Sequence, residues 1–247
     1  MENTKSVKSL KKQLMAAIAM VMVAAIALGS STYAWFVTNN EVKATTSTIS
    51  AQSNAAFMVI KYGDSAITSD LMADSATIGD TPLYPAQWNT TGGKFETAYA
   101  QTVSAATMKA DSLKVIGTGG TPAEAVTDKY AIVNTFNISA KGTNLTNLTV
   151  SGADIKTAGN THLDDALRVL VVSPTGWVLC DKAGVVASES DTSGLLGDTI
   201  TAGEDTEVNL YVYYDGNAEE IYTNNLANLK DASSTITVTF TATADNH

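Results

Sequence analysis

Histidine is the side chain most often used for acid–base catalysis, and this chain of 247 residues contains two, His162 and His247. His247 is the last residue, and His162 lies in the polar run NTHLDD, where capping a turn is its simpler role. Neither histidine belongs to an HExxH arrangement, which would hold a catalytic zinc ion. No GxSxG nucleophile motif accompanies His162 as a base. We therefore expect no catalytic residue, and we expect that the protein is not an enzyme.

Acidic side chains are the other groups that could carry chemistry. A glycosidase needs two carboxylates that face each other across a cleft, but we interpret the acidic clusters as solvated charges in turns. Residues 215–220 (DGNAEE) begin like a calcium-binding loop. The bidentate glutamate of such a loop would stand eleven positions after Asp215, where this chain has Leu226. We expect no cofactor and no regular metal site, and only a weak, irregular calcium site stays open. The acidic clusters are Asp164–Asp165, Glu204–Asp205–Glu207 and Glu219–Glu220.

The single cysteine, Cys180, excludes an intrachain disulfide. It follows the strand-like residues Trp177, Val178 and Leu179, so we predict a buried and inert thiol rather than a reactive one. The formal net charge of −10 argues against a nucleic-acid partner, because the phosphate backbone repels an acidic surface.

Alternation of apolar and polar residues gives the elements that would position these groups. In residues 235–243, Ile236, Val238 and Phe240 alternate with threonines, which is the period of a β-strand. Residues 167–172 and 177–180 flank the turn SPTG and read as a hairpin. The further candidate strands are 35–50, 57–61, 98–108, 113–116, 130–139, 145–150 and 208–214.

Many short strands joined by Gly, Asn, Asp and Ser turns are typical of sandwiches and jelly rolls. We therefore predict an all-β fold, a jelly-roll-like antiparallel β-sandwich with a few short helices in the connections. The expected helices are 65–78, 121–126 and 218–231, and residues 79–97 are expected to be an irregular surface insertion.

The N-terminus has the pattern of an export signal. Lysines precede an apolar run from about Leu14 to Leu28, and small residues follow it. The run is shorter than the roughly 20 residues of a membrane-spanning helix, and we place signal cleavage between Ala34 and Trp35. The alternative is an uncleaved anchor with an aromatic belt of Tyr33, Trp35 and Phe36. The expected organisation is a signal peptide at 1–34, an extended segment at 35–50 and a β domain at 51–247.

Residues 29–36 (GSSTYAWF) and the polar, extended stretch that follows them up to about residue 51 resemble the N-terminus of the TasA/camelysin family. These are exported proteins of Gram-positive bacteria, processed by a signal peptidase of the SipW type. The strand patterns at 130–140 and 235–243 are also similar to that family. Some members have been described as metalloproteases, but this chain lacks the ligand set for such an activity.

The resemblance implies a secreted subunit of extracellular biofilm-matrix fibres. Its partners would be the signal peptidase and further copies of itself, joined head to tail, with membrane contact only before cleavage. The segment freed by cleavage would add as a strand to the next subunit, which is donor-strand complementation. The apolar anchors of that donor strand would be Trp35, Phe36, Val37, Val42 and Ile49.

A second interpretation is a secreted, monomeric binding module or adhesin that recognises a glycan or a cell surface. Its best candidate platform is the aromatic set Tyr84, Trp88 and Tyr99. Packing in a core explains these aromatic residues equally well.

Overall fold

The computed structural model of the chain describes residues 13–23, 48–53, 57–78, 82–98, 114–158, 163–190, 194–221 and 233–245. The chain divides into two compact units, Met1–Asn39 and Asn40–His247. In the first unit, residues 13–23 form a helix whose side chains are exposed. Among the described residues, no helix has both the length and the apolar character needed to cross a membrane.

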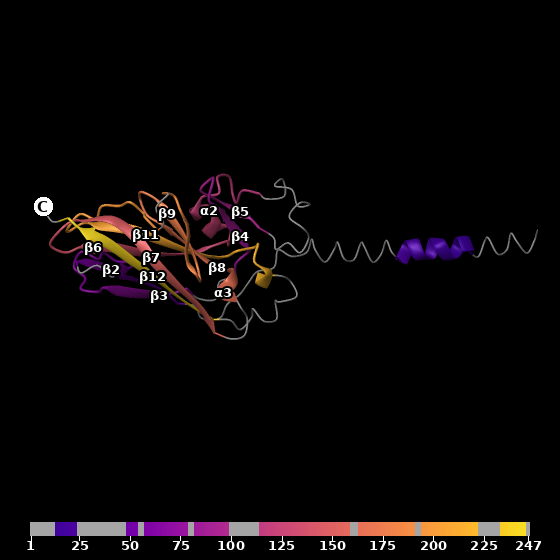
Figure 1. The fold of residues 1–247 in the computed structure, drawn as a ribbon, viewed down its shortest axis with the longest axis horizontal. Coiled ribbons are helices and arrows are strands. Elements are labelled where there is room, and N and C mark those ends of the chain that lie inside the picture. Colours follow the sequence, from indigo (N-terminus) through magenta and orange to yellow (C-terminus); the bar gives the residue numbers. More distant parts are fainter. Residues whose placement is uncertain are drawn as a thin grey trace, which may run out of the picture. The chain divides into compact units, whose positions relative to one another are not determined.

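The second unit is built from strands and contains a few short helical turns (Figure 1). The helical elements among its described residues are α2 (Pro122–Thr127), α3 (Leu163–Ala166) and the 3-10 turn η2 (Glu219–Ile221), which lie in the connections. The strands are β1 (Thr48–Ser53), β2 (Met58–Tyr62), β3 (Ala73–Thr77), β4 (Ala86–Asn89), β5 (Lys94–Thr97), β6 (Ile132–Ala140), β7 (Leu145–Ala158), β8 (Leu167–Val172), β9 (Trp177–Asp181), β10 (Gly184–Ser188), β11 (Asp205–Tyr214) and β12 (Ser233–Ala244).

Two main sheets form the sandwich. A four-stranded sheet has the order β3-β1-β12-β7, and a six-stranded sheet has the order β10-β9-β8-β11-β6-β2. Strands β4 and β5 form a separate hairpin. Neighbouring strands are antiparallel throughout, with the exception of β1 and β12, which are parallel. The predicted all-β sandwich is confirmed.

The main core lies between the two sheets. Ile236, Val238 and Phe240 of β12 are all fully buried, as their alternation predicts, because every second side chain of a strand points to the same face. They meet apolar residues of the six-stranded sheet such as Phe136 and Val169 in one continuous cluster. This shared core holds the two sheets face to face.

A second core covers the outer face of the six-stranded sheet. Leu170, Trp177, Leu179 and Tyr213 point away from the main core and pack against the β4–β5 hairpin and α2. Figure 1 shows α2, β4 and β5 gathered at one end of the unit, away from β2 and β3. Since both faces of β8 are covered, its sequence LRVLVV reads as a nearly continuous apolar run instead of an alternating one.

The hairpin β4–β5 corrects the prediction that residues 79–97 are irregular. Asn89 closes its turn, because Asn89 Oδ1 accepts hydrogen bonds from Thr91 N at 3.0 Å and from Gly92 N at 3.1 Å. Gly93 has a φ of 59°, a conformation that glycine adopts without steric cost. The two prolines at positions 82 and 85 precede the hairpin and therefore do not interrupt it.

The helix predicted at 65–78 is wrong. Residues 73–77 form β3, and the loop before it exposes Ile67, Leu71 and Met72 to solvent. A helix needs one buried apolar face, whereas here the backbone of residues 73–77 pairs with β1. Two other segments differ from expectation: residues 114–116 contribute only an isolated bridge from Val115 to Glu96, and β7 runs to Ala158 instead of ending near Val150.

The helix predicted at 121–126 is confirmed as α2. Thr121 caps it, and its side chain and that of Glu124 bond reciprocally to each other's backbone N–H in a capping box. Most of the predicted strand 98–108 and most of the predicted helix 218–231 lie outside the described residues. Within the described part of the second segment, residues 219–221 form the 3-10 turn η2.

Candidate functional site

The side chains expected to be poor candidates for catalysis are only partly within the described residues. His162 and His247 lie outside them, as does Tyr99 of the aromatic set. Cys180 is fully buried, and its burial, aided by the negative charge of Asp181, raises the pKa of the thiol to about 12. A thiol with so high a pKa is protonated at neutral pH and is a poor nucleophile. The prediction of a buried cysteine is confirmed.

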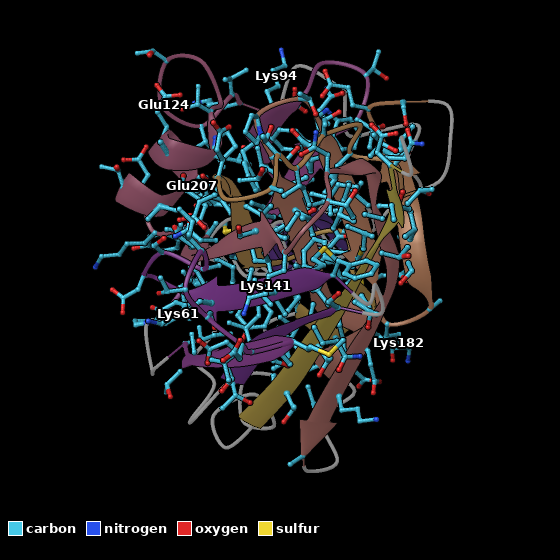
Figure 2. The ribbon with its side chains drawn as sticks, turned by 90° about the vertical axis from the view of Figure 1, so that its left-hand side faces the viewer. Lys61, Lys94, Glu124, Lys141, Lys182 and Glu207 are labelled. Atoms are coloured by element: carbon cyan, nitrogen blue, oxygen red, sulfur yellow. The ribbon has the colours of Figure 1, made fainter. Side chains whose placement is uncertain are left out.

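The adjacent carboxylates Asp164 and Asp165 both contact one lysine. Asp164 Oδ2 lies 3.3 Å from Lys182 Nζ, which also contacts Asp165; Figure 2 shows Lys182 at the edge of the unit. Burial alone would raise the pKa of Asp164, but hydrogen bonds from Thr157 and Lys182 outweigh it and hold the pKa below its usual value. Asp164 is therefore an ionised partner of a lysine and does not resemble a general acid.

Asp215, the first residue of the calcium-like sequence, is already engaged. Its carboxylate lies 3.0 Å from Arg168 Nη2, and Asn217 N donates to Asp215 Oδ1 at 3.0 Å. Among the described residues, no group of three or more His, Cys, Asp or Glu side chains is arranged to hold a metal ion.

One of the three aromatic residues of the adhesin interpretation, Trp88, lies in the core. Trp88 is 7% exposed and belongs to the second core. Its ring lies 5.0 Å from that of Phe95 and 5.5 Å from that of Trp177, both edge to face. Tyr84 packs against Tyr130 at 5.6 Å between ring centroids. Of the three aromatic residues proposed as a platform, Trp88 is therefore core.

One carboxylate that the sequence does not point to is buried beside this core. Glu96 is 9% exposed and accepts hydrogen bonds from Gln87 Nε2 at 2.9 Å and from Asn89 Nδ2 at 3.0 Å. Residues 87, 89 and 96 lie on neighbouring strands of the hairpin, and sequence spacing alone could not have brought them together. The network satisfies the carboxylate and links the two strands.

The position of β1 within the four-stranded sheet bears most directly on the expected donor strand. This strand lies between β12 and β3 in the four-stranded sheet, parallel to the first and antiparallel to the second. Ile49 and Ala51 are fully buried and Ser53 nearly so, while the intervening residues are half-exposed. A mostly polar hexapeptide, TISAQS, thus completes the sheet by alternating small or apolar side chains into the core.

Side chains of β1 also bond to β12. Ser50 Oγ donates to Ile236 O at 3.2 Å and lies 3.1 Å from Thr237 Oγ1. Gln52 Nε2 donates to Thr239 Oγ1 at 2.8 Å. Strand β12 therefore binds β1 through half-exposed side chains as well as through the backbone. Thr237 and Thr239 of β12 supply hydroxyl partners for these hydrogen bonds.

The strand β1 changes where the folded domain begins. The predicted boundary at residue 50 cuts through β1, and Ile49, predicted as an anchor of the donor strand, is instead a core residue of its own chain. The domain therefore begins no later than Thr48. The other expected site residues, Ala34, Trp35, Phe36, Val37 and Val42, lie outside the described residues.

Neither the family models, nor the curated proteins, nor the solved structures contained a match to this chain.

Proposed function

We propose that this protein is a secreted structural subunit that polymerises into extracellular, biofilm-matrix fibres. In this proposal a signal peptidase of the SipW type cuts between Ala34 and Trp35. The freed residues 35–47 then add as a strand to the next subunit. The proposal rests on the resemblance of residues 29–36 to the TasA/camelysin family and on the chain that follows them.

The observation that carries the proposal is the way β1 is seated. The freed segment runs directly into Thr48, the first residue of β1. In β1 a short and largely polar sequence is held as an inserted strand, with Ile49 and Ala51 as small apolar anchors. Residues 35–47 (WFVTNNEVKATTS) have the same character, with Trp35, Phe36, Val37 and Val42 as larger anchors. A sheet edge that accepts such a strand gains main-chain hydrogen bonds from any partner of this composition.

The length of the segment is sufficient for exchange between subunits. Thirteen extended residues span about 43 Å at roughly 3.3 Å per residue, which is longer than the roughly 17 Å of a five-residue strand. The segment can therefore leave its own domain and still reach a neighbour. Because donor and acceptor are different surfaces, the contact is heterologous and gives an open filament.

A fibre subunit does not need a catalytic centre, and several reactive groups among the described residues are buried or paired. Cys180 is buried, Asp164 and Asp165 contact Lys182, and Asp215 pairs with Arg168. The burial of Trp88 removes a principal support for a glycan-binding surface.

The test combines N-terminal sequencing of the secreted protein with negative-stain microscopy. We expect a mature chain that begins at Trp35 and forms filaments. A chain that lacks residues 35–47 but keeps every described residue from Thr48 onward should remain monomeric. Filaments of equal abundance from the shortened chain, or a mature chain that stays monomeric at every concentration and pH, would overturn the proposal. Saturable glycan binding by such a monomer would favour the adhesin instead.

A further inference from the structure

Exposed apolar side chains are concentrated in one stretch of the folded unit. Of the large hydrophobic residues that are exposed in its described part, one, Val186, lies in β10, and all the others fall between residues 57 and 72. Large exposed apolar patches on a soluble domain commonly mark an interaction surface. The residues of this stretch are Phe57, Tyr62, Ile67, Leu71 and Met72, exposed by 40–48%.

Hydrogen bonds place the end of this stretch at the corner between the two sheets. Ile60 N of β2 donates to Leu71 O at 2.8 Å, and Ser53 N of β1 donates to Met72 O at 2.8 Å. Met72 directly precedes β3 and lies four residues before Ala76, which faces the core. Its side chain is therefore expected on the same face as that of Ala76. Met72 is nevertheless 48% exposed. The core-facing side of the four-stranded sheet is therefore left uncovered at this corner.

The outer edge of β3 adjoins this corner and carries few bonds. Within the described residues, β3 pairs with β1 alone. On its other edge, Ser75 N donates to the side chain of its own neighbour, Asp74 Oδ1, at 2.8 Å. The other oxygen of Asp74 accepts a hydrogen bond from Tyr62 N at 2.9 Å. One carboxylate thus shields the edge of β3, in a place where an incoming backbone could take over the bond to Ser75 N.

The three other outer strands are protected differently. The first half of β7 is covered by residues 194–200, for example through Leu148 N to Asp198 O at 3.1 Å, and its second half carries Asp154 and Lys156. Strand β2 bonds to Leu71 and Asp74. Strand β10 has an irregular register at Val186. Coverage, charges and bulges are common devices that prevent pairing at a sheet edge. The edge of β3 adjoins two exposed apolar residues, Leu71 and Met72, whereas β10 carries one, Val186, at its irregular register.

We propose that the outer edge of β3, together with Leu71 and Met72, is the surface that receives residues 35–47 of a second copy of this chain. This inference rests on the proposed function and names its acceptor. The incoming backbone pairs with residues 73–77, displacing the Asp74 side chain from Ser75 N. Its aromatic and aliphatic anchors cover Met72 and Leu71, which then become buried. The nearby basic side chains Lys61 and Lys141 are paired with Asp64 and Asp70, and the incoming segment carries one acidic and one basic residue, Glu41 and Lys43, so backbone pairing and apolar contact hold the segment.

Cysteine cross-linking tests the contact directly. One mature chain carries Ser75→Cys and the other carries Thr38→Cys, Asn39→Cys or Asn40→Cys, so that neighbouring registers are sampled. Native Cys180 is fully buried and does not compete. After mixing and treatment with diamide, we expect a disulfide-linked heterodimer for at least one pairing, and at least tenfold less product when Val186→Cys replaces Ser75→Cys. Equal yields from the two edges would overturn the inference.

A chain that carries both cysteines distinguishes exchange between copies from pairing within one chain. We expect its cross-linked yield of dimers and higher species to rise with protein concentration. A cross-link that forms within the single chain and does not depend on concentration would show that the segment folds back onto its own β3, which would overturn the inference.

Two substitutions at the acceptor test assembly itself. Ser75→Pro removes an outward N–H and places a ring on the edge, which an edge strand tolerates, and Leu71→Lys puts a charge into the apolar surface. We expect each to slow filament growth at least tenfold with a melting temperature within about 4 °C of the parent. The matched controls, Val186→Pro and Val186→Lys, should assemble normally.

The outcomes separate this inference from the proposed function. If the chain without residues 35–47 fails to assemble while Ser75→Pro and Leu71→Lys assemble normally, the donor segment stands and β3 is not its acceptor. If the shortened chain also forms filaments, the proposed function fails. If the shortened chain and both acceptor variants fail while the Val186 controls assemble, both stand.

Discussion

The two faces of the six-stranded sheet are buried in different ways. Its inner face meets the four-stranded sheet through mostly aliphatic side chains drawn from almost every strand. Its outer face, over β8, β9 and β11, is covered by an aromatic cluster from one hairpin and one short helix. The inner core joins segments that are distant in sequence, whereas the outer core contains a compact local unit. One sheet can therefore pack on one face against strands that are distant in sequence, and on the other face against a short local segment that can open separately.

The largest effect should come from the inner core. Phe240 in β12 is fully buried between the sheets, and replacing it with alanine leaves a cavity that the surrounding residues fill only in part. We expect Phe240→Ala to lower the free energy of unfolding by about 4 kcal/mol, measured by urea denaturation. Thr243→Ala, at an exposed position of the same strand, is the control and should change it by less than about 0.5 kcal/mol. Equal effects would remove the distinction between core and surface in β12.

The outer core should respond locally. Phe95→Ala removes ring contacts to Trp88 at 5.0 Å and to Tyr213 at 5.1 Å. We expect a local cost of about 3 kcal/mol, seen as hydrogen exchange in the β4–β5 hairpin that is faster by about two orders of magnitude. Amides of β12 should change less than about tenfold, because the hairpin can open while the sandwich stays closed. Equal acceleration in both regions would show that the two cores unfold as one.

The cap of α2 gives a smaller perturbation of the same outer core. Thr121 Oγ1 accepts a hydrogen bond from Glu124 N at 3.2 Å, and Ala125 of α2 is buried in the cluster. Thr121→Ala should cost about 1 kcal/mol, whereas Thr121→Ser should retain most of the stability. Thermal unfolding monitored by tryptophan fluorescence measures both, because Trp88 and Trp177 lie in this core.

The smallest effect concerns pH and the same helix. Backbone hydrogen bonds from Thr118 and Thr121, with a further bond from the Thr118 side chain, lower the pKa of Glu124 from 4.5 to about 2. Figure 2 shows Glu124 at the surface beside α2. A depressed carboxyl pKa stabilises the fold above the unfolded value, and this contribution is lost as the pH falls towards the folded value.

Exchange protection of α2 should therefore decrease between about pH 4.5 and pH 2, once the intrinsic exchange rate is corrected for pH. The variant Glu124→Gln should show lower protection at pH 6 and no further loss in this interval. A parallel loss in both proteins would assign the change to another group.

Sequence pattern predicts the elements of the inner core better than those of the outer one. Apolar and polar residues alternate in β12 because one of its faces is buried. The sequence of β8 is a nearly continuous apolar run because both of its faces are buried. The hairpin β4–β5 is short and held by aromatic contacts to residues 177 and 213, which no local pattern can show. The stretch 65–78 has helical apolar spacing, but the contact that decides its structure is the pairing of β3 with β1.

The same limit applies to the candidate site. Local residues predict an extended N-terminal segment with apolar anchors, and they place Ile49 among these anchors. What decides that Ile49 belongs to its own domain is its pairing with Ile236, a partner far along the chain. The edge at β3 is likewise invisible in sequence, because it is defined by which neighbours the strand has.

The parallel pairing of β1 and β12 also has a consequence for the order of events during synthesis. Ser50 and Thr237 form a hydrogen bond across a separation of 187 residues. Strand β1 is therefore synthesised early, but it cannot pair with β12 until residues 233–244 have been synthesised. Until residues 233–244 are available, β3 and β1 lack the strand that joins them to β7. Long-range pairing of this kind is slow to form, and we expect closure of the four-stranded sheet to limit the folding rate.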